Sequence, residues 1–484
     1  MQWCAIFLRE ICIIQIFFVT LWQIMHLRSS DIQTTRKKVV ALWREYVPYY
    51  RRNLAVAFPV MLTQLGAAIV GLADCIMVGH YSTTDLAAVS FANGVFFTFM
   101  VFSMGALMGI TPLVGQAFVQ RQDERVSSLL QNGLWFTFLL GGITTLLLAA
   151  CVPLMPLMGQ DPAVVEAARP YMIMRILSLL PFLLFILQKQ FLEGVGNTIV
   201  AMLVCLVLNL VNILLNWVFI FGHWGAAPMG AYGAGLASLI ATALMPVAFI
   251  IAIACKRDWR HYLSLFSRKQ NSRSILRELA TVGFPIGLQT TMETVLFTIS
   301  FIMVGWISKE ALAAHQVTNQ VADFAFMLSL GVGSATTIRV SHQYGLGDMH
   351  AMRMAANASI HLVLLMNTIG AALMIGLRHY IPYLFTDDPE VIQIAAELLI
   401  FAGLFQYADG LQCVGAGMLR GVTDVKVPMW ITVIAYVLVA LPLGYALMFP
   451  AGLGARGMWI SFVVALTIAA AAFHWRFRKL RIEK

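Results

Sequence analysis

Long apolar runs follow one another along this chain, with short polar stretches between them. Each run has about the length that an α-helix needs to cross the hydrocarbon core of a bilayer, roughly 20 residues. The runs are continuous rather than alternating, which excludes a transmembrane β-barrel. The pattern predicts an all-α polytopic membrane protein with twelve transmembrane helices, near residues 53–80, 86–118, 127–152, 165–190, 198–222, 232–255, 277–305, 312–344, 355–380, 390–418, 427–450 and 455–475.

The composition agrees with a bilayer as the solvent. The chain is 60% hydrophobic and 11% charged, whereas soluble domains carry about 25% charged residues. The net charge of +9 does not indicate nucleic acid, because the basic residues gather in segments 28–52, 256–277 and 476–484. The positive-inside rule predicts that all three are cytoplasmic, which requires an even number of crossings between them. Twelve runs divided six and six by the second segment meet this requirement.

The basic segments also predict the domain boundaries. We expect an N-terminal extension with its basic segment, an N-lobe, a basic linker, a C-lobe and a basic tail, at residues 1–44, 45–255, 256–277, 278–475 and 476–484. Within the extension, residues 11–26 are apolar but short for a span. They fit an extra helix, or translation starts at Met25, and no signal-peptide cleavage site is clear.

An internal repeat relates the two lobes. A shift of 226 residues aligns VAFPVMLTQ with VGFPIGLQT, CIMVGH with FIMVGW, and LAAVSFAN with LAAHQVTN. With a gap of one residue, QDPAVV aligns with DDPEVI and LEGVG with LRGVT. Each repeat holds six predicted helices and starts on the same side, so the two halves are parallel. Such repeats are typical of transporters that rock two bundles around a central site.

Four acids lie well inside the predicted spans, although each costs a few kcal/mol there. None is matched in the other repeat, where the aligned residues are serine, alanine or phenylalanine. The acids are therefore specific to each lobe rather than part of the shared framework, which favours a functional role. They are Asp74, Glu293, Asp323 and Asp409.

Polar neighbours extend the faces around these acids. Gln289 lies one helical turn before Glu293, and Gln406 and Gln412 flank Asp409 three residues to either side. A carboxyl group buried without a cationic partner can bind a proton or a small cation reversibly. Interhelical hydrogen bonding is the alternative role for such acids.

The sequence does not decide between two roles for the amides and bases inside the spans. Asn212 and Asn216 share one helix face and fit either cation binding or interhelical hydrogen bonds. Two bases, Arg175 and Arg339, also lie in predicted spans, and Arg339 is near the cytoplasmic end of its helix. There it fits phosphate contact or snorkelling toward the membrane surface.

The sequence resembles the multidrug and toxic compound extrusion (MATE) family, most closely its NorM-type bacterial branch, over about residues 45–480. The likeness rests on GLADCIMVGHYSTTDLAAV, TPLVGQ, LEGVGNT, NILLNWVFIFG, AAHQ, TTIRV, DDPEV and MLRGVTD. It implies two six-helix lobes around a central cavity and secondary antiport, in which H⁺ or Na⁺ enters as organic cations or other amphipathic drugs leave.

Residue by residue, the resemblance implies cation coupling at Glu293, Asp409 and Asp74, with Na⁺ at the first two if sodium is the coupling ion. It implies that Asn212 and Asn216 form the N-lobe polar cluster. Where NorM-type proteins have a tyrosine, this chain has Phe405, and the lost hydroxyl oxygen favours H⁺. The expected cavity residues are Gln289, Asn212, Asn216, Phe405, Gln412 and Asp323.

We therefore expect a monomeric transporter of the bacterial inner membrane, with small cationic drugs as partners and no cofactor. A flippase for lipids or cell-wall precursors is the alternative within the same superfamily. An intramembrane enzyme is disfavoured, because no His/Glu metal motif occurs and only His315 lies near a spanning acid. A receptor or scaffold is the remaining alternative.

Overall fold

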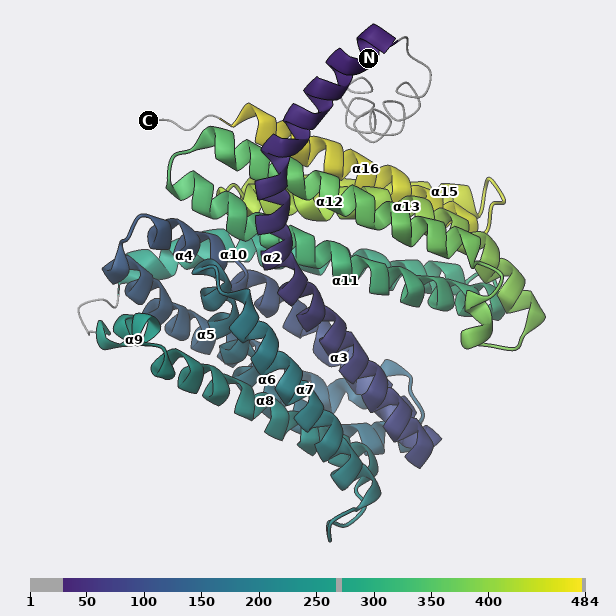
Figure 1. Cartoon of the computed structure of the whole chain (residues 1–484). Helices are drawn as coiled ribbons and strands as arrows, with labels where there is room; N and C mark the ends of the chain where they lie inside the picture. Colours follow the sequence, from purple (N-terminus) through teal and green to yellow (C-terminus); the bar gives the residue numbers. More distant parts are fainter. Residues whose placement is uncertain (1–28, 267–271, 481–484) are drawn as a thin grey trace.

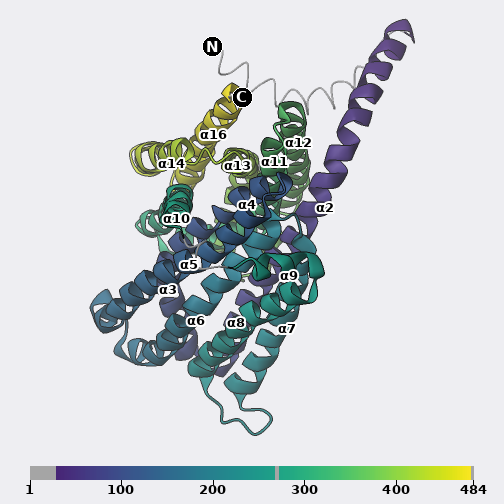
Figure 2. The same ribbon diagram turned by 90° about the vertical axis from the view of Figure 1, so that its left-hand side faces the viewer.

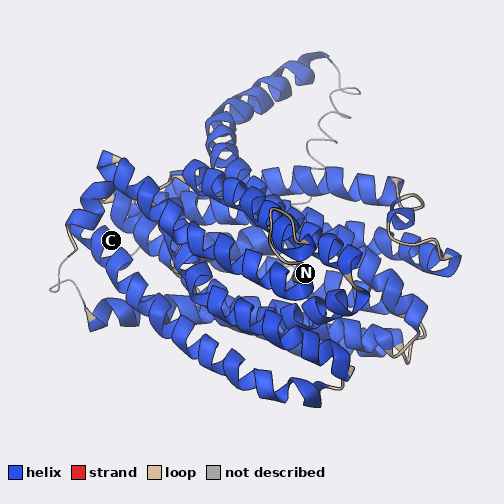
Figure 3. Ribbon diagram, turned by 90° about the horizontal axis from the view of Figure 1, so that it is seen from below, coloured by secondary structure: helices blue, strands red, loops and turns tan. Residues whose placement is uncertain are grey.

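A computed structural model of the chain describes residues 29–266 and 272–480. Within these ranges every regular element is helical and no strand occurs (Figure 3). Twelve helical segments are long and apolar enough to cross a membrane, which confirms the predicted number. The extra helix considered at residues 11–26 lies outside the described ranges.

The first six spans form the N-lobe. They consist of α2 (Ser29–Tyr81), α3 (Thr83–Leu107) with α4 (Ile110–Val119), α5 (Asp123–Cys151) with the 3₁₀ helix η1 (Val152–Met158), α6 (Pro162–Gly194), α7 (Thr198–Phe221) and α8 (Gly230–Cys255). The short helix α9 (Arg257–Ser264) follows them.

The last six spans form the C-lobe. They consist of α10 (Arg273–Gly305), α11 (Lys309–Gly345), α12 (Met349–Gly376) with the short η3 (Ile381–Leu384) after it, α13 (Pro389–Gly421), α14 (Lys426–Val433) continued by η4 (Ile434–Ala440) and α15 (Leu441–Met448), and α16 (Ala455–Lys479). In Figure 1, α5 to α8 lie on one side of the molecule and α11 to α16 on the other.

The first helix is longer than the expected span. The basic segment before residue 53 is helical from Ser29 and continues without interruption into the apolar run. Figures 1 and 2 show this N-terminal part of α2 projecting away from the other helices. The helix α9 and the C-terminal end of α16 both lie toward the left-hand end of the bundle in Figure 1, whereas α2 projects upward. We call this end, which carries residues 257–264 and 476–479, the basic end.

The internal repeat is visible in the helix caps. The hydroxyl of Ser82 accepts from the backbone N–H of Asp85 at 3.3 Å, and that of Ser308 accepts from Ala311 at 3.0 Å. These two serines are 226 residues apart and start the second span of each lobe. A serine oxygen satisfies one of the donors that a helix N-terminus leaves free. Both repeats therefore begin this span by the same local chemistry.

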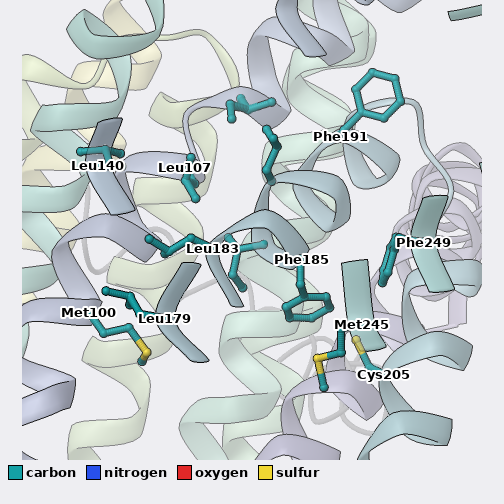
Figure 4. Close-up of a cluster of buried hydrophobic side chains, with 14 of the residues drawn as sticks. Met100, Leu107, Leu140, Leu179, Leu183, Phe185, Phe191, Cys205, Met245 and Phe249 are labelled. Carbon is teal, nitrogen blue, oxygen red and sulfur yellow. The ribbon is translucent and has the colours of Figure 1, made fainter. Parts of the chain in front are cut away.

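Each lobe places its first helix against the other lobe. Ala57 and Met61 of α2 belong to the apolar cluster of α11 to α13, whereas Leu279, Val282 and Ile286 of α10 belong to the N-lobe core. Figure 4 shows part of that N-lobe core, where residues such as Leu183, Phe185 and Phe249 are buried. Burial of such side chains favours association because apolar surfaces pack closely.

Two glycines at equivalent positions of the repeat let these first helices pack closely against the opposite lobe. A Cβ added to Gly105 would lie 2.9 Å from Gly287 Cα, and one added to Gly331 would lie 3.1 Å from Met61 Cα. Contacts this short leave no room for a side chain, so small residues let the helix backbones approach. Gly105 and Gly331 are again 226 residues apart, as are Met61 and Gly287.

A pair of hydrogen bonds joins the lobes at the basic end. Gln116 Nε2 of α4 donates to the carbonyl of Gly421 at 3.0 Å, and His342 Nε2 of α11 donates to the carbonyl of Gly194 at 2.7 Å. The donors are equivalent in the repeat, and so are the two glycines. We call these two bonds the basic-end latch.

Farther from the basic end the two lobes separate. The face of α11 that carries Gly331 also carries Asp323, Gln320 and Gln316, which lie farther from the basic end. Asp323 and Gln316 are exposed. On α3, the face of Gly105 continues in the same way through Phe97 and Ser90, which are exposed. Because both faces point toward the opposite lobe, we infer that they line a space between the lobes. We call this space between the outer halves of α3 and α11 the interlobe cleft.

Candidate functional site

The C-lobe acids come together where three helices meet. Glu293 lies in the middle of α10, and Gln412 of α13 donates to its Oε1 at 2.7 Å. The hydroxyl of Tyr436 lies 3.5 Å from the same oxygen, at the limit of a hydrogen bond. A carboxylate, an amide and a phenol from separate spans therefore converge on one point.

Tyr436 reaches this point from a distorted helix. It lies in η4, a π-helical segment between α14 and α15. Pro442 follows shortly after this segment and has no N–H to donate to the preceding turn. Such π segments are rare and occur frequently at functional sites. Tyr436 was not among the predicted site residues, although Pro442 inside an apolar run is a usable sequence signal.

Asp409 lies deeper than Glu293, on the face of α13 that points into the lobe. Its side chain is 5% exposed, and its Oδ2 has no hydrogen-bond partner among the described residues. It is close enough to Glu293 and Asp323 to interact electrostatically with both. A buried, unpartnered carboxyl near two others is unfavourable as three anions, so the group is suited to taking up a proton or a cation.

The predicted polar face around Asp409 divides into two parts. Gln412 belongs to the acid site, as described above. Gln406 is fully buried, and its side-chain Nε2 donates to the backbone carbonyl of Ala322 at 3.1 Å. The backbone carbonyl of Gln406 accepts from Asn367 Nδ2 at 2.6 Å. Gln406 therefore has a structural role, joining α13 to α11 and α12. Residues three apart do not point in quite the same direction from the helix axis, so Gln406 and Gln412 meet different neighbours.

Two other predicted cavity residues are buried. Phe405 is 3% exposed and packs edge-on against Trp459, with ring centroids 5.5 Å apart, and against Phe297. It therefore forms part of an aromatic cluster. Gln289 is 4% exposed, one turn from Glu293 toward the basic end. The structure places both beside the acid site rather than on the exposed wall of the cleft.

Asp323 is the acid that faces the cleft. It is exposed, and its only described hydrogen bond is from Asn319 Nδ2 to its Oδ2 at 3.2 Å. A charged residue at this depth has to face water or a partner, because lipid solvates it poorly. We infer that the interlobe cleft gives Asp323 access to water. Asp323 therefore connects the cleft electrostatically with buried Asp409.

His315 does not form a catalytic pair with Asp323. The histidine is fully buried, with Nε2 3.2 Å from the hydroxyl of Ser300 and Nδ1 accepting from Trp459 Nε1 at 3.2 Å. Both ring nitrogens thus have structural partners. Within the described ranges, no group of three His, Cys, Asp or Glu side chains could hold a metal ion.

The N-lobe site contains one acid. Asn216 of α7 donates to Asp74 Oδ1 of α2 and lies 3.1 Å from Asn212 Oδ1. Arg175 of α6 interacts electrostatically with Asp74, and its guanidinium carbon lies 4.3 Å from the ring centroid of Phe96. The predicted amide cluster thus contacts Asp74, whereas the role of Arg175 was not predicted.

Three more charged groups lie inside the spans. Arg420 of α13 is near enough to Glu293 to interact with it electrostatically. At the aligned N-lobe position, Glu193 forms a buried ion pair with Lys189, with N and O 3.6 Å apart. The same framework position therefore carries opposite charges in the two lobes.

Comparisons with known proteins agree with this architecture. The MatE family model matches residues 59–218 and again residues 285–446, so the two matches begin 285 − 59 = 226 residues apart. This offset equals the shift of the internal repeat. The two matches together cover more than half of the chain.

Curated relatives are similar along most of their length. A probable multidrug resistance protein NorM from Xylella fastidiosa strain Temecula1 is 33% identical over 429 residues, 88% of this chain and 91% of the relative. A protein of the same description from Rhizobium meliloti strain 1021 is 33% identical over 438 residues, 89% of this chain and 94% of the relative.

Solved structures share the fold at lower identity. An outward-facing multidrug resistance MATE family transporter superposes with a TM-score of 0.82 at 21% identity, covering 89% of this chain and 95% of its own. A eukaryotic MATE transporter gives 0.81 at 19% identity, covering 90% and 97%.

Proposed function

We propose that this chain, which belongs to the MatE family of membrane transporters, is a secondary antiporter that exports small amphipathic cations in exchange for H⁺ or Na⁺. Transporters of this family are not enzymes. The single observation that carries the proposal is the buried Asp409, whose Oδ2 has no partner among the described residues and which is in electrostatic range of cleft-facing Asp323. The names of the curated relatives, which describe multidrug resistance proteins, support the substrate class.

The exchange follows from the mutual repulsion of the acids. When Asp409 and Glu293 are ionised, their field adds to that of Asp323 and attracts a cation into the interlobe cleft. When an H⁺ or Na⁺ occupies the buried pair, that field weakens and the cation leaves. The two ligands thus disfavour each other, which is the thermodynamic requirement for antiport. The absence of a hydroxyl at Phe405 favours H⁺.

The orientation of the protein is part of the proposal. The positive-inside rule places the basic end in the cytoplasm, so the interlobe cleft opens outward in this conformation. The curated relatives come from bacteria, which supports a location in the bacterial inner membrane. We propose that it works as a monomer, since each chain carries both lobes.

A lipid or cell-wall precursor flippase remains the second candidate. One solved structure of similar fold is a transporter from Pyrococcus furiosus, with a TM-score of 0.79 at 21% identity, whose binding pocket of reverse polarity suggests a different function for that protein. The polarity of the cavity therefore separates these functions. Here the exposed charge on the cleft wall is acidic, which repels phosphate head groups.

Efflux from energised membrane vesicles tests the proposal. Ethidium should be transported across the vesicle membrane only when a proton or a sodium gradient is imposed. Imposing the two gradients separately identifies the coupling ion. Glu293→Gln should abolish this transport while the amount of protein in the membrane is unchanged, because the amide cannot exchange a proton. Wild-type efflux by Glu293→Gln, or transport of a fluorescent phospholipid instead of ethidium, would overturn it.

A further inference from the structure

Arg339 is a charged side chain that the antiport scheme does not use. It lies on α11, six residues before the end of that helix at the basic end. Its Nε and Nη2 are buried and have no hydrogen-bond partner among the described residues. Leaving guanidinium donors buried and unpaired is costly, more so than for a neutral group. The repeat-equivalent residue is Leu113, so the shared framework does not require an arginine here.

The groups near Arg339 are not the ones that would normally neutralise it. The residues that interact with it electrostatically are Arg52 and Tyr49, both on α2. Arg52 is exposed and Tyr49 is half-buried. Two guanidinium groups of like charge therefore lie near enough to repel one another across the joint between α2 and α11. Without a third group, their repulsion opposes the packing of these helices.

This arrangement matches the chemistry of a phosphate. Arginine donors form short, charge-assisted bonds with phosphate oxygens, and a guanidinium can bind two of them at once. A tyrosine hydroxyl can donate a further bond. We propose that Arg339, Arg52 and Tyr49 form a binding site for a phosphate group, most directly the head group of an anionic phospholipid. The positive-inside rule predicts that the basic end lies near the head groups of the cytoplasmic leaflet.

The site spans the two lobes. Arg52 belongs to the first helix of the N-lobe, whereas Arg339 belongs to the second helix of the C-lobe. A phosphate held by both arginines joins α2 to α11 at the end of the bundle where the basic-end latch also lies. A ligand that binds one conformation better stabilises that conformation. Anionic lipid therefore favours the state with the basic end closed, and its loss makes the lobes easier to separate there.

The test uses the purified full-length protein in detergent micelles, titrated with phosphatidylglycerol or with phosphatidylcholine. Native mass spectrometry counts the bound lipids, and thermal melting measures the stabilisation. Wild-type protein should bind phosphatidylglycerol more tightly than phosphatidylcholine. Arg339→Gln should weaken the phosphatidylglycerol affinity about tenfold or more, as expected for a lost hydrogen bond between charged groups.

Matched variants separate this site from general attraction to anionic lipid. Arg52→Gln changes an exposed residue and should weaken binding without affecting folding. Arg51→Gln removes the same charge from the adjacent position and should bind like wild type. If Arg339→Gln binds phosphatidylglycerol like wild type, or if Arg51→Gln weakens it equally, the site is refuted.

Inorganic phosphate distinguishes the source of the phosphate group. Competition between millimolar phosphate and phosphatidylglycerol, lost in Arg339→Gln, supports one phosphate site that lipid occupies. Stabilisation of wild type by phosphate but not by phosphatidylglycerol assigns the site to a free phosphate instead. If neither ligand discriminates between wild type and Arg339→Gln, the proposal is wrong.

Discussion

In the N-lobe, Asp74 has an amide donor and an arginine beside it, whereas in the C-lobe Asp409 lies within range of two further carboxylates. The helices that hold these acids are built alike. Thr111 donates to the carbonyl of Gln190 at 3.0 Å, and its repeat equivalent Thr337 donates to Gly417 at 3.2 Å. The backbone framework was thus preserved in both lobes while the charges diverged.

This difference indicates that the acid sites of the two lobes have different roles. Arg175 and the amide of Asn216 offset part of the cost of burying the charge of Asp74. The charge of Asp409 is opposed by its neighbours, so its occupancy by a proton or cation is sensitive to Asp323 and Glu293. We infer that the C-lobe site responds to the coupling ion more strongly than the N-lobe site. The following predictions test that inference.

The largest contrast should come from neutralising each central acid. Asp409→Asn should reduce ethidium efflux about 100-fold, near the upper end of the coupling between linked sites. It should also raise the thermal melting temperature, because it removes a buried like-charge interaction. Asp74→Asn should lower the melting temperature instead, since Arg175 then loses its partner. Opposite signs in melting curves support the comparison, and equal signs contradict it.

A smaller effect is expected at the wall of the cleft. Asp323→Asn should raise the KM for a cationic substrate about tenfold, within the range for a partly desolvated ion pair. The maximal rate should change less, because the buried acids remain. Glu310→Gln on the same helix removes the same charge near the helix start and should leave KM unaltered. An unchanged KM in Asp323→Asn would show that substrate charge is recognised elsewhere.

Removing either hydrogen bond of the basic-end latch should shift the conformational equilibrium by the same amount. Gln116→Ala and His342→Ala each remove one interlobe hydrogen bond, typically about 1 kcal/mol or a fivefold shift in population. Distances between spin labels at the basic end, measured by pulsed electron resonance, should show more of the open form in each variant. A shift in only one variant would mean that the repeat symmetry of the latch has no energetic counterpart.

The smallest effects should come from the helix caps. Ser82→Ala and Ser308→Ala each remove one capping bond and should destabilise the protein by about 1 kcal/mol. Thermal melting of the two variants should agree within error, and transport should persist in both. Strongly unequal losses would indicate that the two frameworks are less alike than their caps suggest.

Much of the fold was predictable because membrane spans depend on local composition. Length and hydropathy identified all twelve spans, and the repeat offset of 226 residues agrees with the two matches of the family model. Within the site, the contact between Asn216 and Asp74 follows the predicted grouping, as does that between Gln412 and Glu293. That these residues couple ion and substrate stays a prediction.

Other parts of the site could not be predicted from spacing. Gln406 and Gln412 are equally distant from Asp409 in sequence, yet one bonds to backbone between helices and the other to Glu293. Tyr436 reaches the site only because η4 is a π-helix, and His315 turns to Trp459 rather than to Asp323. Rotation of each helix about its axis decides these partners.

Composition along the chain is enough to predict which segments cross the membrane, that two six-helix halves repeat, and which charges lie inside the spans. These properties depend on single helices, since the bilayer penalises each polar residue locally. Which charges meet depends instead on how the helices pack. Arg175 lies near Asp74, Oδ2 of Asp409 has no partner among the described residues, and Arg339 lies near Arg52. Electrostatic interactions fall with distance in space, and packing sets the distance between helices.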